Sequence, residues 1–285
     1  METLFKRHGP AILALIIVIL ISLLLQTVIS GTTFQQDRLA VWVFDVGQGD
    51  AIFIDGPEKQ ILIDGGPNGI VLEKLTSVIP FWDRSIDVII NTHPHADHVT
   101  GLNYVLDRYE IEEVWVSGQN YGTDVFAEFE SLKTPRLVSS GYEIDLGAGA
   151  VLTVLWPEYD LDGQRLDDPN DGSVVTLVTY GDTTILLTGD IGVDEEEQLL
   201  DHLPRIDVLK VGHQGSITSS SPDFLDVIDP RYAIITVGEN DYGHPSPIVL
   251  DRLESTGAII LRTDQDGDIR ILSDGGEPEV TTFDL

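Results

Sequence analysis

The first part of the chain is apolar, and the rest alternates between apolar and polar positions. Residues 11–29 contain no charged side chain and only three polar ones, Ser22, Gln26 and Thr27. At 1.5 Å per residue, about 19 helical residues span about 28 Å, which is close to the thickness of the hydrocarbon core of a bilayer. This pattern predicts one transmembrane helix at the N-terminus.

The residues that flank the apolar segment predict its orientation. Lys6 and Arg7 precede it within residues 1–10, whereas the linker 30–38 begins with an uncharged stretch. Because positive residues favour the cytoplasmic side, we expect a single-pass protein of the cell membrane with residues 39–285 forming an extracytoplasmic domain. The alternative is a cleaved signal peptide and a secreted domain, since Val28 and Ser30 are small enough to precede a cleavage site.

From residue 39 onward, short apolar runs of strand length alternate with segments of helix length. The turn Gly181-Asp182 between two such runs predicts a hairpin. Strands are predicted at residues 39–46, 51–54, 61–63, 86–90, 111–116, 151–155, 174–180, 183–187, 208–211, 232–237, 258–261, 269–272 and 280–283, and helices at 71–78, 99–109, 125–132, 223–227 and 248–255. Meanders and α/β units recur in both halves, which predicts an α/β fold of two sheets packed face to face with helices outside.

Composition excludes several classes of function. The 285 residues include no cysteine, so a disulfide scaffold, a thiolate zinc site and a cysteine nucleophile are all excluded. Any metal must therefore be held by His, Asp or Glu. The 48 acidic and 16 basic side chains give a net charge of -32, which opposes nonspecific binding of nucleic acid unless a local cationic feature such as a metal ion overrides it.

Metal-type ligands concentrate directly after the strand predicted at residues 86–90. His93, His95, Asp97 and His98 fall within six residues of a chain that has only seven histidines. His93 and His95 alternate as on an extended backbone and can point toward one cation, while Asp97 and His98 follow the bend and can serve a second. Two ions about 3.5–4 Å apart are typical of hydrolytic sites that share a bridging water or carboxylate.

This segment also carries a resemblance to a known family. HPHADH at residues 93–98, with LIDGG at 62–66 and LTGD at 187–190, resembles the metallo-β-lactamase superfamily of αββα metallohydrolases. The resemblance implies an αββα sandwich and a metal-dependent hydrolase site.

Further motifs narrow the resemblance. FDVGQGD at residues 44–50, NDGSVV at 170–175, DVLKVGHQGS at 207–216 and YGHP at 242–245 are similar to the C-terminal hydrolase domain of ComEC-type DNA-internalisation competence proteins. The resemblance implies a phosphodiester-cleaving enzyme. It does not imply DNA uptake, because full-length members carry a multi-span channel domain, but separately encoded channel or competence proteins are possible partners.

The resemblance assigns roles to individual residues. It implies that His93 and His95 bind the first metal, that Asp97 and His98 bind the second, and that the carboxylate of Asp190 bridges both and so takes part in catalysis. The expected cofactors are two divalent ions, Zn²⁺ or Mn²⁺, since imidazole and carboxylate ligands suit these ions.

One ligand that many superfamily members have is missing. They supply a third histidine to the first metal between the His cluster and the bridging Asp, and no histidine lies between His98 and His202. Asn170 or Asp171 can fill this gap, or the first site is weak and the enzyme carries only one ion.

Three later residues are candidates for catalysis or metal binding. His213 and His244 each follow a predicted strand and compete for the second metal. The alternative for His213 is to donate a proton to the leaving group, and the alternative for His244 is to contact the substrate phosphate. His213 is favoured for the metal. Lys210 either faces the scissile group or is a strand lysine that extends its stem to solvent.

Supporting residues are also predicted. Asp64 resembles the carboxylate that orients a ligand imidazole without itself binding the metal. Ser216 and the run 219–221 offer hydroxyls and free N–H groups that either receive a phosphate oxygen or simply cap a helix. Gln214 stands where the family more often has a second histidine.

These observations predict a membrane-anchored hydrolase that cleaves a phosphodiester, in DNA or another nucleic acid, by attack of a metal-activated hydroxide. Hydrolysis of a small ester or lactone is the alternative within enzymes, because this chemistry accepts many electrophiles. A tethered, non-catalytic domain that binds metal or nucleic acid is the alternative outside them.

Overall fold

The computed structural model describes residues 17–19, 22 and 37–285. The chain divides into the units Met1–Asp37 and Arg38–Leu285, and the second is a compact α/β unit. Most of the membrane segment predicted at 11–29, its flank and most of its linker lie outside the described residues. Among the residues that are described, no helix is both long and apolar enough to cross a membrane.

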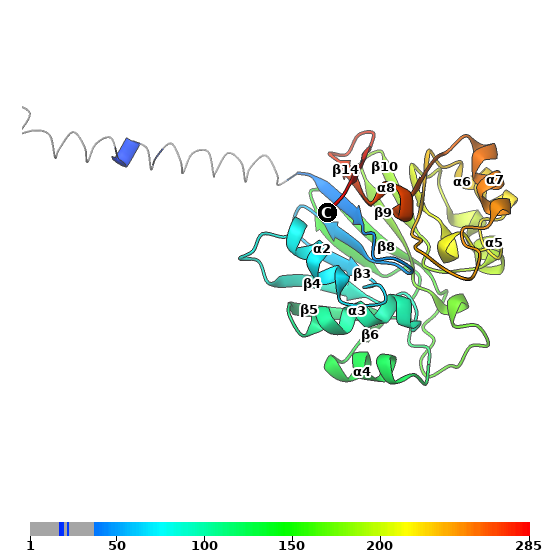
Figure 1. Cartoon of the computed structure of the whole chain (residues 1–285), viewed down its shortest axis with the longest axis horizontal. Helices are drawn as coiled ribbons and strands as arrows, with labels where there is room; N and C mark the ends of the chain where they lie inside the picture. The colour runs from blue at the N-terminus through cyan, green and yellow to red at the C-terminus, as the bar shows by residue number, and fades with distance from the viewer. Residues whose placement is uncertain (1–16, 20–21, 23–36) are drawn as a thin grey trace, which may run out of the picture. The chain divides into compact units, whose positions relative to one another are not determined.

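Two β-sheets form the centre of the second unit (Figure 1). The first has the order β15-β14-β1-β2-β3-β4-β5-β6, and the second has the order β13-β12-β11-β10-β9-β8-β7. The strands of the first sheet are β1 (Leu39–Val43), β2 (Ile52–Asp55), β3 (Gln60–Ile63), β4 (Ser85–Ile90), β5 (Glu110–Val116), β6 (Arg136–Leu137), β14 (Asp268–Ser273) and β15 (Glu279–Phe283). Those of the second are β7 (Glu143–Gly147), β8 (Ala150–Trp156), β9 (Val175–Tyr180), β10 (Thr183–Leu187), β11 (Val208–Lys210), β12 (Tyr232–Ile235) and β13 (Ile259–Arg262).

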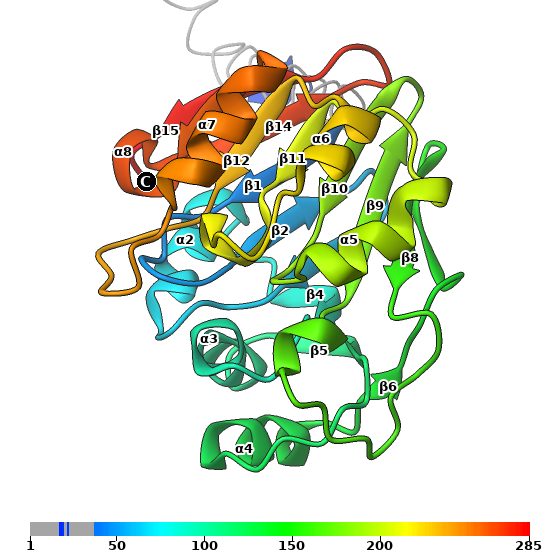
Figure 2. The same ribbon diagram turned by 90° about the vertical axis from the view of Figure 1, so that its right-hand side faces the viewer.

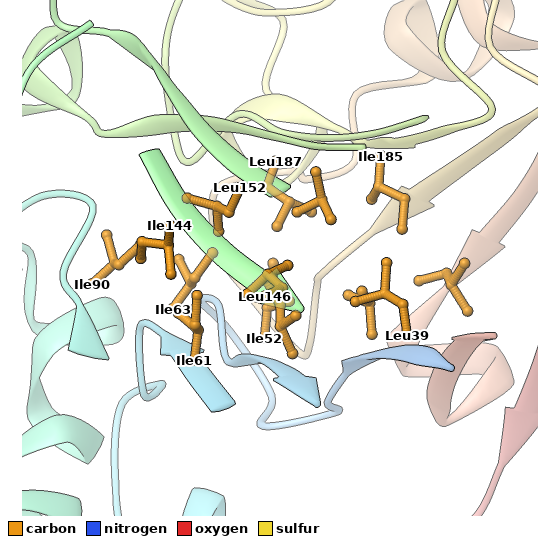
Figure 3. Packing of buried hydrophobic residues seen from close by; sticks show 14 of the residues in the cluster. Leu39, Ile52, Ile61, Ile63, Ile90, Ile144, Leu146, Leu152, Ile185 and Leu187 are labelled. Carbon is orange, nitrogen blue, oxygen red and sulfur yellow. The ribbon is translucent and has the colours of Figure 1, made fainter. Parts of the chain in front are cut away.

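The two sheets face each other across an apolar core (Figure 3). Alternate residues of β1, beginning with Leu39, are buried, so one face of this strand enters the core. Ile52 and Ile61 come from the same sheet, and Ile185 and Leu187 meet them from β10. Burial of these faces is the main force that holds the sheets together.

Helices cover the outer face of each sheet. The outer helices of the first sheet are α2 (Ile70–Val78), α3 (Ala96–Leu106) and α4 (Asp124–Leu132), and those of the second are α5 (Val193–Leu199), α6 (Pro222–Ile228) and α7 (Pro247–Thr256). Figure 2 shows the second set lying over β10, β11 and β12. A further short helix, α8 (Thr263–Asp266), precedes β14. The predicted sandwich of two sheets with helices outside is confirmed.

Sequence patterns missed some elements and boundaries. Helix α3 begins at Ala96, three residues earlier than predicted, so Asp97 and His98 lie in its first turn. Helix α5 was not predicted, because its sequence VDEEEQL has few apolar residues. Strands β6 and β7 were also missed, since β6 has only two residues and β7 only two aliphatic ones.

Strand direction brings the loops of both sheets to one edge. Strands β3, β4 and β5 run parallel, as do β10, β11, β12 and β13. The His cluster follows β4, Asp190 follows β10, and His213 follows β11. Ligand sites of α/β proteins lie at the carboxyl ends of such strands.

Candidate active site

His93 and His95 lie on the extended segment after β4, and their imidazole nitrogens face each other. Nε2 of His93 is 3.1 Å from Nδ1 of His95. The single proton of the Thr92 hydroxyl goes to Asp64 at 2.6 Å, so the hydroxyl oxygen accepts the Nδ1 proton of His93 at 2.9 Å. Burial and the neighbouring His98 hold the pKa of His93 well below its ordinary value. His93 therefore presents an unprotonated Nε2, which is the form that binds a metal ion.

His98 is fully buried in the first turn of α3. Asp64 accepts the Nδ1 proton of His98 at 2.8 Å, and it also accepts the backbone N–H of Thr92 at 2.8 Å and the amide of Asn91 at 3.1 Å. These bonds fix the ring so that Nε2 faces the site. Burial lowers the pKa of His98, but Asp190 and Asp64 outweigh it and raise the pKa well above its ordinary value.

Two carboxylates converge on Nε2 of His98. Oδ2 of Asp190 lies 3.3 Å from this nitrogen, and Oδ2 of Asp97 lies 3.7 Å from it. Asp190 is 2% exposed, at the end of β10, whereas Asp97 is half-buried. The three groups that the resemblance assigns to the second metal and to the bridge are therefore brought together.

Lys210 is buried behind Asp190. Its Nζ donates to the carbonyl of Gly189 at 2.9 Å, lies 3.4 Å from Oδ1 of Asp190, and forms an ion pair with Asp50. Burial disfavours the ammonium, but Asp50 and Asp190 raise the pKa of Lys210 above its ordinary value. Burial likewise disfavours the Asp190 carboxylate, but His98 and Lys210 hold its pKa well below the usual range. Asp190 is thus an anion with one oxygen toward Lys210 and the other toward His98.

A pocket of about 460 Å³ opens over these groups. It is lined by Gln48, Pro67, His95, Ala96, Asp97, Asp190, His213, Gln214, Tyr242 and His244. Among the described residues, none of those lining it is a lysine or an arginine, and Lys210 lies outside the lining. An anionic substrate must therefore be neutralised here by bound cations or by imidazoles.

His213 and His244 lie side by side at the pocket. Their ring centroids are 5.5 Å apart, and Nε2 of His213 is 3.5 Å from Nδ2 of Asn170. Burial and the proximity of His213 lower the pKa of His244. Gln214, rather than His213, supplies the contacts to Asp97, His98 and Asp190 from this loop.

The remaining predicted residues differ in where they lie. Asn170 is buried, and its Oδ1 accepts no hydrogen bond from the described residues. Asp171 is exposed and lines a second pocket with Trp156, whose indole donates to the Asp171 carbonyl at 2.8 Å. Ser216 is buried against Thr218, with 3.0 Å between their hydroxyl oxygens, and does not line the larger pocket.

The residues present fit divalent cations. Candidate ligand atoms of Asp50, His98 and Asp190, all buried, lie within 4.8 Å of one another. The facing nitrogens of His93 and His95 adjoin this group, and every donor is an imidazole or a carboxylate. Such donors suit Zn²⁺ and Mn²⁺.

Comparison with known proteins agrees with this geometry. The sequence profile of the metallo-β-lactamase superfamily matches residues 44–239. The chain belongs to this superfamily. It is 29% identical over 252 residues to ComE operon protein 3 of Bacillus subtilis, which covers 80% of this chain and 32% of that protein. The resemblance to competence proteins is confirmed.

Two further comparisons extend this result. Exodeoxyribonuclease WalJ of Streptococcus pneumoniae is 29% identical over 77 residues, covering 25% of this chain and 29% of that protein. The metallo-β-lactamase fold protein YhfI of Bacillus subtilis superposes with a TM-score of 0.55 at 12% identity, covering 82% of this chain and 100% of that one, and so shares the fold. The chain spans about a third of the length of the curated relatives that it matches.

Within this metallo-β-lactamase domain, sequence reasoning missed the roles of Asp50 and Gln48. Asp50 pairs with Lys210 and accepts the hydroxyl proton of Thr236 at 2.5 Å. Both residues stand in the FDVGQGD motif, whose Gly49 lies so close to Asp97 that a Cβ would be 1.9 Å from its carbonyl oxygen. The signal available in the sequence was that Asp50 directly follows a glycine, a residue that permits such close contact.

Glu196 of α5 holds the segment that follows His213. Its carboxylate accepts the backbone N–H groups of Ser220 at 2.5 Å and Ser221 at 2.8 Å. Burial raises the pKa of Glu196 to about 7, against an ordinary value of 4.5. The folded state therefore binds a proton on the Glu196 carboxyl more tightly than the unfolded chain does. The resulting stability is lost as pH rises from about 4.5 to about 7.

We expect Glu196→Gln to remove this pH dependence. The melting temperature of the wild type should fall relative to that of the variant between pH 4.5 and 7.5, because only the wild type loses the proton. Thermal unfolding of both proteins across this range measures the difference. A difference that stays constant with pH would contradict the raised pKa.

Proposed function

We propose that the chain is a metal-dependent phosphodiesterase that acts on nucleic acid. The convergence of Asp97, His98 and Asp190 beside His93 and His95 at the pocket carries this proposal. Divalent ions held by these residues would supply the Lewis acidity that activates water and neutralises the phosphate.

The residues of the chain itself provide the remaining functions. Asp190 stays ionised because His98 and Lys210 stabilise its charge, so it can accept a hydrogen bond from the attacking water. Asp64 keeps His98 in one orientation. The sequence favours His213 as a metal ligand, but Gln214 supplies the contacts of this loop to the second-metal group, so we assign proton donation to the leaving oxygen to His213, which is half-buried at the pocket. The neighbouring His244 would contact the phosphate.

Two observations favour nucleic acid over a small ester. The pocket is open to solvent, and the side chain of Tyr242 at its rim is 77% exposed, so a base can stack there. A relative of one part of the chain is named as an exodeoxyribonuclease. Because the net charge of -32 repels a polyanion, bound cations must also provide the local attraction.

Cleavage assays distinguish this function from its alternatives. The full chain in detergent, loaded with Mn²⁺, is expected to cleave an end-labelled DNA oligonucleotide faster than p-nitrophenyl acetate or γ-butyrolactone. Turnover of the ester or lactone alone would favour a small-molecule hydrolase. Ions bound without any turnover would favour a binding domain.

We also propose that residues 11–29 anchor the chain in the cell membrane with the hydrolase domain outside the cytoplasm, where separately encoded channel or competence proteins could work beside it. The uncharged segment and the preceding Lys6 and Arg7 support this topology. Protease added to spheroplasts should digest the domain and leave a short membrane-bound fragment. Protection until lysis would contradict this orientation, and full release into the medium would indicate a cleaved signal peptide.

A further inference from the structure

The side-chain amide of Gln214 lies among the groups assigned to the second metal. Its Nε2 is 3.2 Å from Oδ2 of Asp97, 3.2 Å from Oδ2 of Asp190 and 3.4 Å from Nε2 of His98. An amide nitrogen has two protons and no lone pair available to a metal ion. Gln214 therefore presents a hydrogen-bond donor at a position where the family more often has a second histidine.

A second glutamine fixes the direction of this amide. Nε2 of Gln48 donates to Oε1 of Gln214, and Oε1 of Gln48 accepts the backbone N–H of Gly238 at 3.3 Å. A backbone N–H can only donate, so the carbonyl oxygen of Gln48 must face Gly238 and its amide must face Gln214. If Gln214 alone were reversed, two NH₂ groups would oppose each other.

Close packing holds in place the relay of hydrogen bonds from Gly238 through Gln48 to Gln214. A Cβ on Gly238 would lie 2.6 Å from the carbonyl carbon of Gly47, so the two loops touch directly beside Gln48. Gln214 is 3% exposed, so the surrounding groups leave its side chain little room to move elsewhere.

We propose that the relay from Gly238 through Gln48 to Gln214 weakens cation binding at the half-site formed by Asp97, His98 and Asp190. To bind there, a cation must push the Gln214 amide N–H groups away from Asp97 and Asp190. Otherwise the hydrogen bond from Gln48 must break so that Gln214 can turn its Oε1 toward the ion. This half-site then takes a hard, exchangeable divalent cation such as Mn²⁺, because an amide oxygen suits it better than a soft ion. The inference rests on the metal dependence proposed above, and it adds a residue that regulates metal occupancy.

Cation binding by the full chain tests the relay without measuring hydrolysis. Equilibrium dialysis against graded free Mn²⁺, followed by elemental analysis, gives the affinity of each ion. Gln48→Met keeps the length of the side chain but cannot donate to Gln214. One ion should then bind about tenfold more tightly, which corresponds to the loss of the one hydrogen bond from Gln48 to Gln214. Gln48→Glu can accept from both Gly238 and Gln214, reverses the amide of Gln214, and should tighten the same ion further.

Two controls make the result specific. In an Asp97→Asn background, which damages the half-site, Gln48→Met should have no effect on either ion. Gln60→Met, at the opposite end of the strands, should leave both affinities unchanged, and circular dichroism should show that all variants are folded.

Several results would contradict the proposed effect of the relay on cation binding. Unchanged affinities in a folded Gln48→Met variant would do so, as would an effect that persists in the Asp97→Asn background. Tightening by Gln48→Glu alone would indicate simple charge attraction. A chain that binds no cation would overturn the proposed function as well, whereas normal cation binding without DNA cleavage would count only against the proposed substrate.

Discussion

Asp190→Asn is expected to lower phosphodiester hydrolysis by about 10³-fold or more and to reduce the content of both metal ions. The side chain keeps its volume, but the loss of charge removes the anion that faces His98 on one side and Lys210 on the other. Elemental analysis after dialysis and initial rates at saturating Mn²⁺ measure the two effects. A folded variant that retains the full metal content would contradict the bridging role.

His98→Ala provides the comparison for this result. It should empty only the half-site that His98 shares with Asp97, because His93 and His95 still face each other. Equal metal loss in the two variants would indicate that the site binds its ions as one unit.

Lys210→Met is expected to destabilise the domain by about 3–5 kcal/mol, the usual cost of removing one partner of a buried ion pair. Asp50 and Asp190 are both buried, and Lys210 is the cation between them. Their mutual repulsion would then be uncompensated. Chemical denaturation of wild type and variant in the same buffer measures the loss.

A double variant separates charge from packing in this cluster. Asp50→Asn combined with Lys210→Met removes one anion together with the cation, and should recover part of the lost stability. If the double variant is as unstable as the sum of the two single variants, the loss comes from packing and not from unpaired charge.

Most of the fold could be predicted from the pattern of apolar residues. Strand β4 is rich in β-branched residues that are buried, and alternate burial marks β1, so the layers follow from periodicity. Helix α5 was missed because its acidic residues leave no apolar periodicity, although one short face that includes Glu196 and Leu199 is buried. Its charged positions make contacts that only the folded chain shows, such as Glu196 with the backbone of Ser220.

From residue spacing alone, the site could be predicted only where its residues are close in sequence, whereas Asp64 and Asp190 were assigned through the family resemblance. His93, His95, Asp97 and His98 could be recognised together because they follow one strand. By contrast, the burial of Lys210 depends on Asp50, which is brought beside it from the loop between β1 and β2 of the other sheet. The contact of Gln48 with Gln214 joins residues 166 positions apart, and no local pattern predicts it.

The most direct test of the proposed chemistry follows the oxygen atom of the attacking water. The full chain, stripped with EDTA and reloaded with Mn²⁺, should hydrolyse bis(p-nitrophenyl) phosphate in ¹⁸O-labelled water and place one labelled oxygen in each molecule of p-nitrophenyl phosphate formed. Hydrolysis should stop when the metal is removed and return when it is restored. Metal-loaded protein that releases no product, or product without the label, would contradict metal-assisted attack of water on a phosphodiester.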